Sequence, residues 1–231
     1  MLTPKKKITK KEMKEDALVS SYVKATTFYY ENKQMILMGV TAVVVIIAGI
    51  LLYGKYRTDN NNNAALNLGD IYPLYDAGEY QHAIDGIPER NIKGLKAIVE
   101  EFGNSDAGEV ARFYLANAYY QLGRFDDALD QFKRYSPASQ VLEISRLSGL
   151  AACYEAKGNY KEAASDYEKA ANKDLKAVSA AENLFCAARN YAKSGDTTTA
   201  LAMYKKVKSE YSTSSFGREA DRAIGGLTAL Q

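Results

Sequence analysis

The longest apolar run of the chain lies near its N-terminal end. No charged side chain occurs between Lys33 and Lys55, and residues 35–53 read MILMGVTAVVVIIAGILLY. In a helix these 19 residues span roughly 28 Å, close to the ~30 Å hydrocarbon thickness of a bilayer. A helix also satisfies its own backbone hydrogen bonds where water is absent. The pattern therefore predicts a transmembrane helix over 35–53.

The segments on either side of this run are polar. Thr9 and Glu12 have the spacing of a helix capping box, and Leu18, Tyr22 and Tyr29 then recur on one helical face. We therefore expect a lysine-rich amphipathic helix within residues 1–34. It lies against lipid headgroups, contacts a partner, or simply extends the anchor. Residues 54–63 end in four asparagines and are expected to form a flexible polar linker.

Beyond the linker a pattern of small and large residues repeats four times. A glycine is preceded by a small or apolar residue seven positions earlier and by a large one four positions earlier. It is followed by an alanine five positions later and, in general, a large residue nine positions later. The glycines are Gly78, Gly123, Gly158 and Gly195, and the alanines are Ala83, Ala128, Ala163 and Ala200.

Each unit of this pattern is typical of a helical hairpin. The glycine ends the first helix, the small residues let two helices approach closely, and the large ones fill the space before the next hairpin. One hairpin cannot bury its apolar face alone, so the units must stack into a solenoid. We expect an all-α fold with about four repeats over 64–211 and a C-terminal capping helix over 212–231. In the first, degenerate repeat, Pro73 and Pro88 are expected to interrupt the helices, and an inserted helix is expected near 91–102.

The repeats resemble the tetratricopeptide repeat (TPR), most clearly in YLANAYYQLGRFDDALDQF and GLAACYEAKGNYKEAASDY. This resemblance implies a right-handed solenoid of helical hairpins whose first helices line a concave groove. By the TPR register, the groove residues that bind a partner are Tyr72, Tyr75, Phe113, Asn117, Tyr120, Gln121, Phe185 and Arg189. Such amphipathic rings and amides suit extended or unfolded polypeptide. Some TPR domains clamp a C-terminal carboxylate, but Phe113 occupies a position where that clamp needs a cation.

The charge distribution predicts how the chain is oriented in a membrane. The formal net charge is +2, yet residues 1–34 hold eight lysines against four acids, so the remainder is slightly acidic. Because the basic side of a single span stays cytoplasmic, the repeats are expected on the opposite side of the membrane. A cleaved signal peptide is the alternative, disfavoured by the long N-terminal segment and the missing A-x-A site. The reverse orientation, with cytosolic repeats on a eukaryotic organelle, is also conceivable. Nothing in this charge balance indicates nucleic-acid binding.

The residues that carry chemistry are sparse, and we expect a protein without enzymatic activity, cofactor or metal site. The single histidine, His82, lies among helix residues, and no serine-hydrolase, zinc-protease or phosphate-loop motif occurs. Cys153 and Cys186 have no metal-ligand spacing. They are expected to be buried thiols, with a disulfide as the alternative.

A basic N-terminal helix, one signal anchor and outward TPR repeats together resemble the YfgM-type family of inner-membrane proteins. That resemblance implies a bacterial cytoplasmic (inner) membrane with the repeats in the periplasm. It also implies an adaptor near the Sec translocon that binds translocon subunits, chaperones or unfolded polypeptide. The segment EEFGNSDAGEVARFYLANAYYQLGRF also resembles the TPR proteins of Tol-Pal and outer-membrane assembly, which implies an envelope-assembly scaffold instead. A regulatory subunit of a membrane enzyme is the third possibility.

Overall fold

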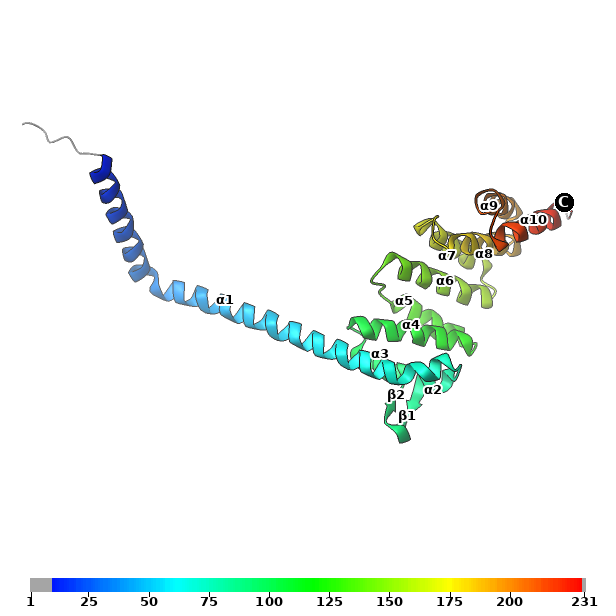
Figure 1. Ribbon diagram of the computed structural model, residues 1–231, viewed down its shortest axis with the longest axis horizontal. Coiled ribbons are helices and arrows are strands. Elements are labelled where there is room, and N and C mark those ends of the chain that lie inside the picture. The colour runs from blue at the N-terminus through cyan, green and yellow to red at the C-terminus, as the bar shows by residue number, and fades with distance from the viewer. Residues whose placement is uncertain (1–9, 230–231) are drawn as a thin grey trace, which may run out of the picture. The chain divides into compact units, whose positions relative to one another are not determined.

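The computed structural model describes residues 10–229, which form ten α-helices and one small hairpin. Helix α1 (Lys10–Asp76) runs from the N-terminal segment into the first repeat (Figure 1). The chain divides into two compact units, residues 1–56 and residues 57–231. Each unit is described by itself below.

The first unit is formed by the part of α1 before Arg57. Its apolar side chains are largely exposed, and none of the most apolar 18-residue window is buried. By length and composition this helix is able to cross a membrane. The helix bends at Asn32, whose φ of −111° and ψ of 15° are not helical.

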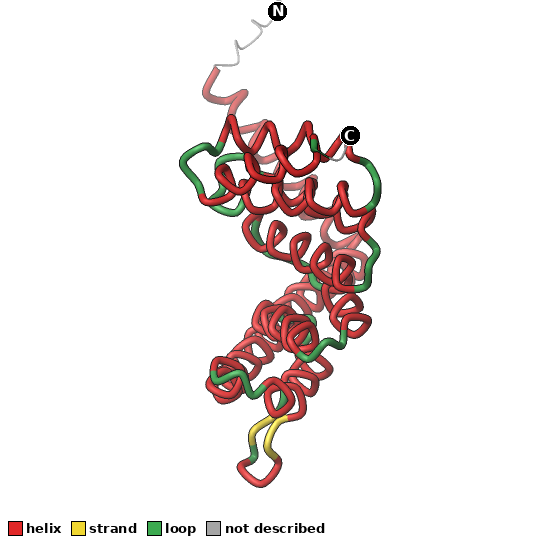
Figure 2. Tube along the Cα trace, turned by 90° about the vertical axis from the view of Figure 1, so that its right-hand side faces the viewer, coloured by secondary structure: helices red, strands yellow, loops and turns green. Residues whose placement is uncertain are grey.

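The second unit is the all-α stack of hairpins that the repeat pattern predicts. Its pairs are α4 (Asp106–Gln121) with α5 (Phe125–Arg134), α6 (Gln140–Ala156) with α7 (Tyr160–Lys173), and α8 (Ala180–Lys193) with α9 (Thr197–Glu210). Successive helices pack side by side along the stack, which Figure 2 shows to curve. Helix α10 (Ser215–Thr228) follows in the predicted cap region. It packs Phe216, Ile224 and Leu227 against the last apolar cluster.

The aligned glycines close the turns of the hairpins. Gly78, Gly123, Gly158 and Gly195 all have φ between 72° and 90°, which residues with a Cβ rarely adopt. After each glycine, the next backbone N–H donates to the carbonyl of the large residue four positions before it, at 2.9 Å in all four turns. These acceptors are Leu74, Tyr119, Tyr154 and Tyr191. The bond ends the first helix in a Schellman turn.

The small residues of the pattern are the points of closest helix contact. The alanine that follows each glycine by five positions is 0% exposed in all four repeats. Phe132, itself 1% exposed, lies across Gly149 of the next hairpin, where an added Cβ would come within 2.4 Å of its ring. The large residue of one repeat therefore packs on bare backbone of the next.

The first repeat differs from the expected form in two ways. Pro73 does not interrupt its first helix, because α1 continues to Asp76 and Ala77 N donates to the Pro73 carbonyl at 3.0 Å. The second helix, α2 (Tyr80–Asp85), stops before Pro88 at Gly86. An antiparallel hairpin of β1 (Gly86–Ile87) and β2 (Ile92–Lys93) follows, with the short 3-10 helix η1 (Pro88–Arg90) at its tip. The insertion then ends in α3 (Leu95–Phe102).

The asparagine-rich segment is helical rather than a flexible spacer. Asn61 Oδ1 accepts a hydrogen bond from Ala107 N at 2.8 Å, in the first turn of α4. Arg57 Nη2 also lies 3.2 Å from Asp106 Oδ1. Because the first N–H groups of a helix lack partners inside it, the Asn61 amide satisfies one of them. This contact explains why residues 57–63 belong to the repeat unit.

Candidate protein-binding site

The predicted binding residues lie on the first helices of three of the four hairpins, namely the end of α1, α4 and α8. The turn glycines set their register, because each residue occupies a fixed distance from the glycine that ends its helix. Some of them belong to an aromatic group on the first two repeats, Arg189 belongs to a polar group that joins the third repeat to the fourth, and the others join neither group.

The aromatic group is a set of tyrosine rings shared by α1 and α4. Tyr72 and Tyr75 have ring centroids 6.4 Å apart, and both contact Tyr114, at 5.6 and 4.9 Å. Tyr75 also contacts Tyr80 at 5.5 Å. Edge-to-face pairs of this kind hold the rings in place. Burial, followed by the neighbouring phenols, raises the pKa of Tyr75 to about 12, so this hydroxyl stays a protonated donor. Tyr72 remains 44% exposed.

The predicted binding residues of α4 differ in how exposed their side chains are to a partner. Phe113 is half-buried against Phe132 and Tyr135, at 6.0 and 5.4 Å. Asn117 Nδ2 donates to the Phe113 carbonyl at 2.8 Å, inside its own helix. Tyr120 packs on Phe125 at 5.5 Å, and Gln121 is exposed. Phe113 therefore serves mainly the core, whereas Gln121 is open to solvent.

The polar group is centred on the Glu155 carboxylate of α6. Arg189 Nη2 and Asn190 Nδ2 lie 2.9 and 3.0 Å from its Oε2, and Lys193 Nζ lies 2.9 Å from its Oε1. Burial alone raises the pKa of Glu155, but the hydrogen bonds from these three α8 residues outweigh it and hold the pKa below its ordinary value. Two cations facing one carboxylate leave this centre positively charged.

Two buried amides of α8 accompany this centre. Asn183 is 3% exposed and its Oδ1 accepts from Ser148 Oγ at 2.8 Å, whereas Asn190 is 0% exposed. Within the described part of the chain, Asn183 Nδ2, Asn190 Oδ1 and Arg189 Nε are buried without a hydrogen-bond partner. The sequence reasoning missed Asn183, Asn190, Lys193 and Tyr114. The seven-residue spacing of Asn183 and Asn190, which places them on one helical face, was the available signal.

Phe185 does not join either group. Its ring contacts Tyr204 of α9 at 5.3 Å and Phe216 of α10 at 5.7 Å. It therefore packs between the last repeat and the helix that covers it, and only part of its surface is open.

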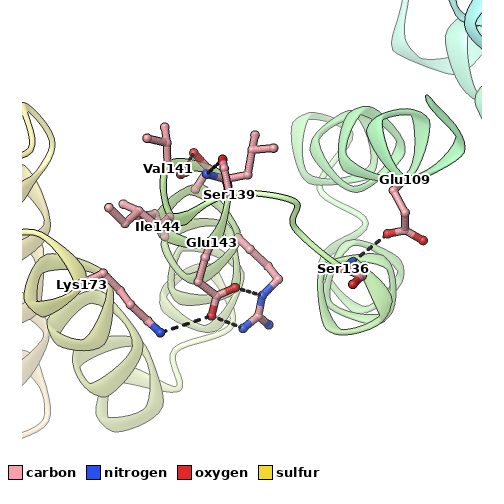
Figure 3. A network of polar contacts seen from close by, with 11 residues as sticks. Glu109, Ser136, Ser139, Val141, Glu143, Ile144 and Lys173 are labelled. Carbon is pink, nitrogen blue, oxygen red and sulfur yellow. Dashed lines mark hydrogen bonds and ion pairs between the residues drawn. The ribbon is translucent and has the colours of Figure 1, made fainter. Parts of the chain in front are cut away.

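A second polar network closes the open ends of two hairpins (Figure 3). Glu109 near the start of α4 accepts from Ser136 N at 2.7 Å, just after α5. Glu143 near the start of α6 accepts from Arg146 Nε and Nη2, at 2.7 and 2.8 Å, and lies 4.0 Å from Lys173 Nζ, the last residue of α7. These contacts join the two ends of each hairpin and have a structural role.

The cysteine and histidine side chains, which are the strongest candidates for reactive groups, are either buried or isolated from one another. Cys153 and Cys186 are both buried and free, and burial raises the pKa of their thiols to about 12 and about 11. His82 is exposed and lies 3.0 Å from Glu79. Over residues 10–229, no group of three or more histidine, cysteine or acidic side chains is placed to hold a metal ion.

Comparisons with known proteins agree with this arrangement. Residues 68–213 match the family described as "Psidin, N-terminal TPR repeats region". Two crystal structures have the same fold. Both are of nearly identical TPR-like repeats of a putative kinesin light chain from Podosopora anserina, and one of them is a variant. Each is 15% identical to this chain with a TM-score of 0.56, and the match covers 70% of this chain and 82% or 83% of theirs. No curated protein matches the chain. The family match extends over more than half of the sequence, so this chain is a TPR protein that belongs to the Psidin N-terminal TPR repeat family.

Proposed function

We propose that this chain is a single-pass membrane protein whose TPR repeats act as an adaptor. They bind polypeptide or chaperone partners at the outer face of the cytoplasmic membrane, near the Sec translocon. The observation that carries the proposal is the combination, in one chain, of TPR repeats with an apolar helix over 35–53 in which no residue is buried. TPR repeats mediate protein–protein contacts, and a tether raises their local concentration at the membrane.

The membrane part of the proposal is tested on the full chain produced in bacteria. We expect the intact chain in the membrane fraction after alkaline extraction, with residues 1–34 still present by mass spectrometry. A reporter fused after Gln231 should be active only in the periplasm. A chain cleaved after residue 53 would instead identify the apolar run as a signal peptide, and a cytosolically active reporter would reverse the orientation.

The binding part is tested by crosslinking from single positions. Tyr72 and Gln121 expose enough surface on the first helices for a photoreactive side chain. Lys161, exposed on α7, is the matched control on a second helix. We expect partners to be trapped from Tyr72 and Gln121 and not from Lys161. Trapping only from Lys161 would show that another face binds.

The identity of the partner is tested by purifying the chain in mild detergent. Recovery of translocon subunits or periplasmic chaperones supports the adaptor. Recovery of outer-membrane assembly or cell-wall proteins would instead support the envelope-assembly scaffold and contradict a role near the translocon.

A further inference from the structure

The part of α1 that precedes the apolar run carries two separate stripes of side chains. Apolar or weakly polar residues recur at intervals of three and four, which places them on one helical face. They are Val19, Tyr22, Val23, Thr26 and Tyr30. Polar residues follow the same spacing on another face and are Ser20, Lys24, Thr27 and Glu31. The helix over 19–31 is therefore amphipathic, with one large apolar residue, Phe28, outside the apolar stripe.

The apolar stripe is uncovered within the first unit. Val19 is 62% exposed, Tyr22 71%, Val23 53% and Tyr30 76%. Leaving this much apolar surface in water is unfavourable, so we expect the stripe to lie in an apolar environment that this unit does not itself supply.

The bend at Asn32 separates this amphipathic stretch from the apolar run. Asn32 Nδ2 donates to the Phe28 carbonyl at 2.9 Å, four residues earlier. An asparagine side chain that bonds the backbone in this way competes with the helix ladder. Only Lys33 and Gln34 then remain before Met35. Figure 1 shows the two arms of α1 meeting at this bend. A helix in the plane of a bilayer must turn at such a point to enter the hydrocarbon.

The charge around this helix selects the kind of surface. Residues 19–31 hold one lysine and one acid, but residues 1–18 before them hold six lysines against three acids, and Lys33 follows. Such an excess of cations is attracted to anionic lipid headgroups at the cytoplasmic leaflet. Tyrosine rings, with an apolar body and a polar tip, are favoured at that depth.

We propose that residues 19–31 form an interfacial helix that lies in the headgroup region of an anionic membrane. Its apolar stripe faces the acyl chains, and Asn32 is the corner between this helix and the span. The inference rests on the proposed membrane anchoring and adds a second lipid contact to it. The surface is lipid and not protein, because the stripe adjoins the apolar run and the residues before the helix are basic.

The test measures the depth of single positions in the full chain. Val23→Cys and Lys24→Cys place a nitroxide on the apolar and polar stripes of the same turn. Val44→Cys marks the span, and Ser209→Cys marks the repeats. The parent chain, whose two cysteines are buried, is the labelling blank. The variants are reconstituted in vesicles of phosphatidylcholine with phosphatidylglycerol, or of phosphatidylcholine alone.

In the anionic vesicles we expect the Val23 label to collide several-fold more with oxygen, relative to a water-soluble nickel chelate, than the Lys24 label. The difference should narrow in phosphatidylcholine alone. Equal water access at both positions would overturn the proposal, since the helix would then project into solvent. Shielding of Val23 from both reagents would overturn it in favour of a protein contact.

The Val44 label separates this proposal from the anchoring on which it rests. A Val44 label buried in lipid with Val23 in water contradicts only the interfacial helix. A Val44 label in water contradicts both.

Discussion

Glu155 holds together three residues of the helix packed across from it, and its side chain is only 16% exposed. The carboxylate neutralises one of two facing cations and accepts a hydrogen bond from Nδ2 of the fully buried Asn190. We expect Glu155→Gln to lower the free energy of unfolding by about 1–2 kcal/mol, a modest value because Arg189 and Lys193 still reach solvent. Chemical denaturation of the full chain in detergent measures it. Glu162→Gln, exposed on α7, should change little.

The same residue makes stability depend on pH. The pKa of Glu155 in the folded chain lies below its ordinary value of 4.5, so the folded state binds this proton less readily than the unfolded state. Its contribution is therefore complete above about pH 4.5 and is lost as the pH falls through the depressed pKa. We expect the gap between the parent chain and Glu155→Gln to shrink steadily on acidification below this value. A gap that stays constant down to the acid unfolding transition would contradict the assignment.

Gly149 tests how tightly successive hairpins approach. A Cβ at this position would come within 2.4 Å of the Phe132 ring, which is 1% exposed and has no room to move. We expect Gly149→Ala to lower the thermal midpoint and to cost about 1–3 kcal/mol. Gly226→Ala in α10 meets nothing within 4 Å and should instead stabilise slightly, because alanine favours a helix. Equal effects of the two substitutions would show that the approach is not tight.

At the scale of elements, serine side chains begin several of the helices. Ser105 Oγ accepts from Gly108 N at 3.0 Å and donates to the Phe102 carbonyl at 2.8 Å, so it joins α3 to α4. Ser179 precedes α8 without a side-chain cap bond.

Alanine substitution of these two serines separates the effect of the cap hydrogen bond, which only Ser105 makes, from the effect of the residue change itself. We expect Ser105→Ala to destabilise the chain by about 1–2 kcal/mol and Ser179→Ala by much less. Hydrogen exchange of the first turn of α4 would locate the loss. An unchanged exchange rate there would show that the Ser105 cap contributes little.

The elements also show where sequence reasoning succeeds and where it fails. The turns at Gly78, Gly123, Gly158 and Gly195 were predictable because one local rule, a left-handed residue that ends a helix, recurs four times. The hairpin of β1 and β2 was not predictable, because strands of two residues are too short to show an alternating pattern. The helical state of residues 57–63 depends on Asn61 meeting Ala107, a contact 46 residues away, which composition cannot reveal.

The candidate binding site was likewise predictable from the sequence only in part. The TPR register placed Tyr72, Tyr75 and Arg189 on the first helices, since each position is counted from a turn glycine. The register did not reveal that Phe185 packs on Tyr204 and Phe216. Nor did it reveal that Lys193 meets Glu155, because such pairings depend on how neighbouring hairpins stack.

At the scale of the whole repeat unit, the last hairpin depends on the helix that covers it. In a solenoid each repeat is stabilised only by its neighbours. A chain that ends at Ser212 lacks α10 and uncovers Phe185, Tyr204 and Val207. We expect a loss of roughly 3 kcal/mol from repeat four, and faster proteolysis within α8 and α9 than within α4 and α5. A chain that ends at Ala229, which retains all of α10, is the control. Uniform proteolysis along the stack would contradict this dependence.

The two buried thiols have a consequence for measuring how the stack opens. Cys153 and Cys186 lie on the first helices of successive hairpins. Both thiols are buried, so each helix must separate from its neighbours or unfold before a reagent in solution can attack its cysteine. The chain thus contains one intrinsic reporter of local opening in each of two adjoining repeats. If the repeats open one at a time, the two thiols react at different rates. If they open as one unit, the two thiols react at the same rate. The reaction rates of the two cysteines therefore measure how cooperatively the solenoid opens.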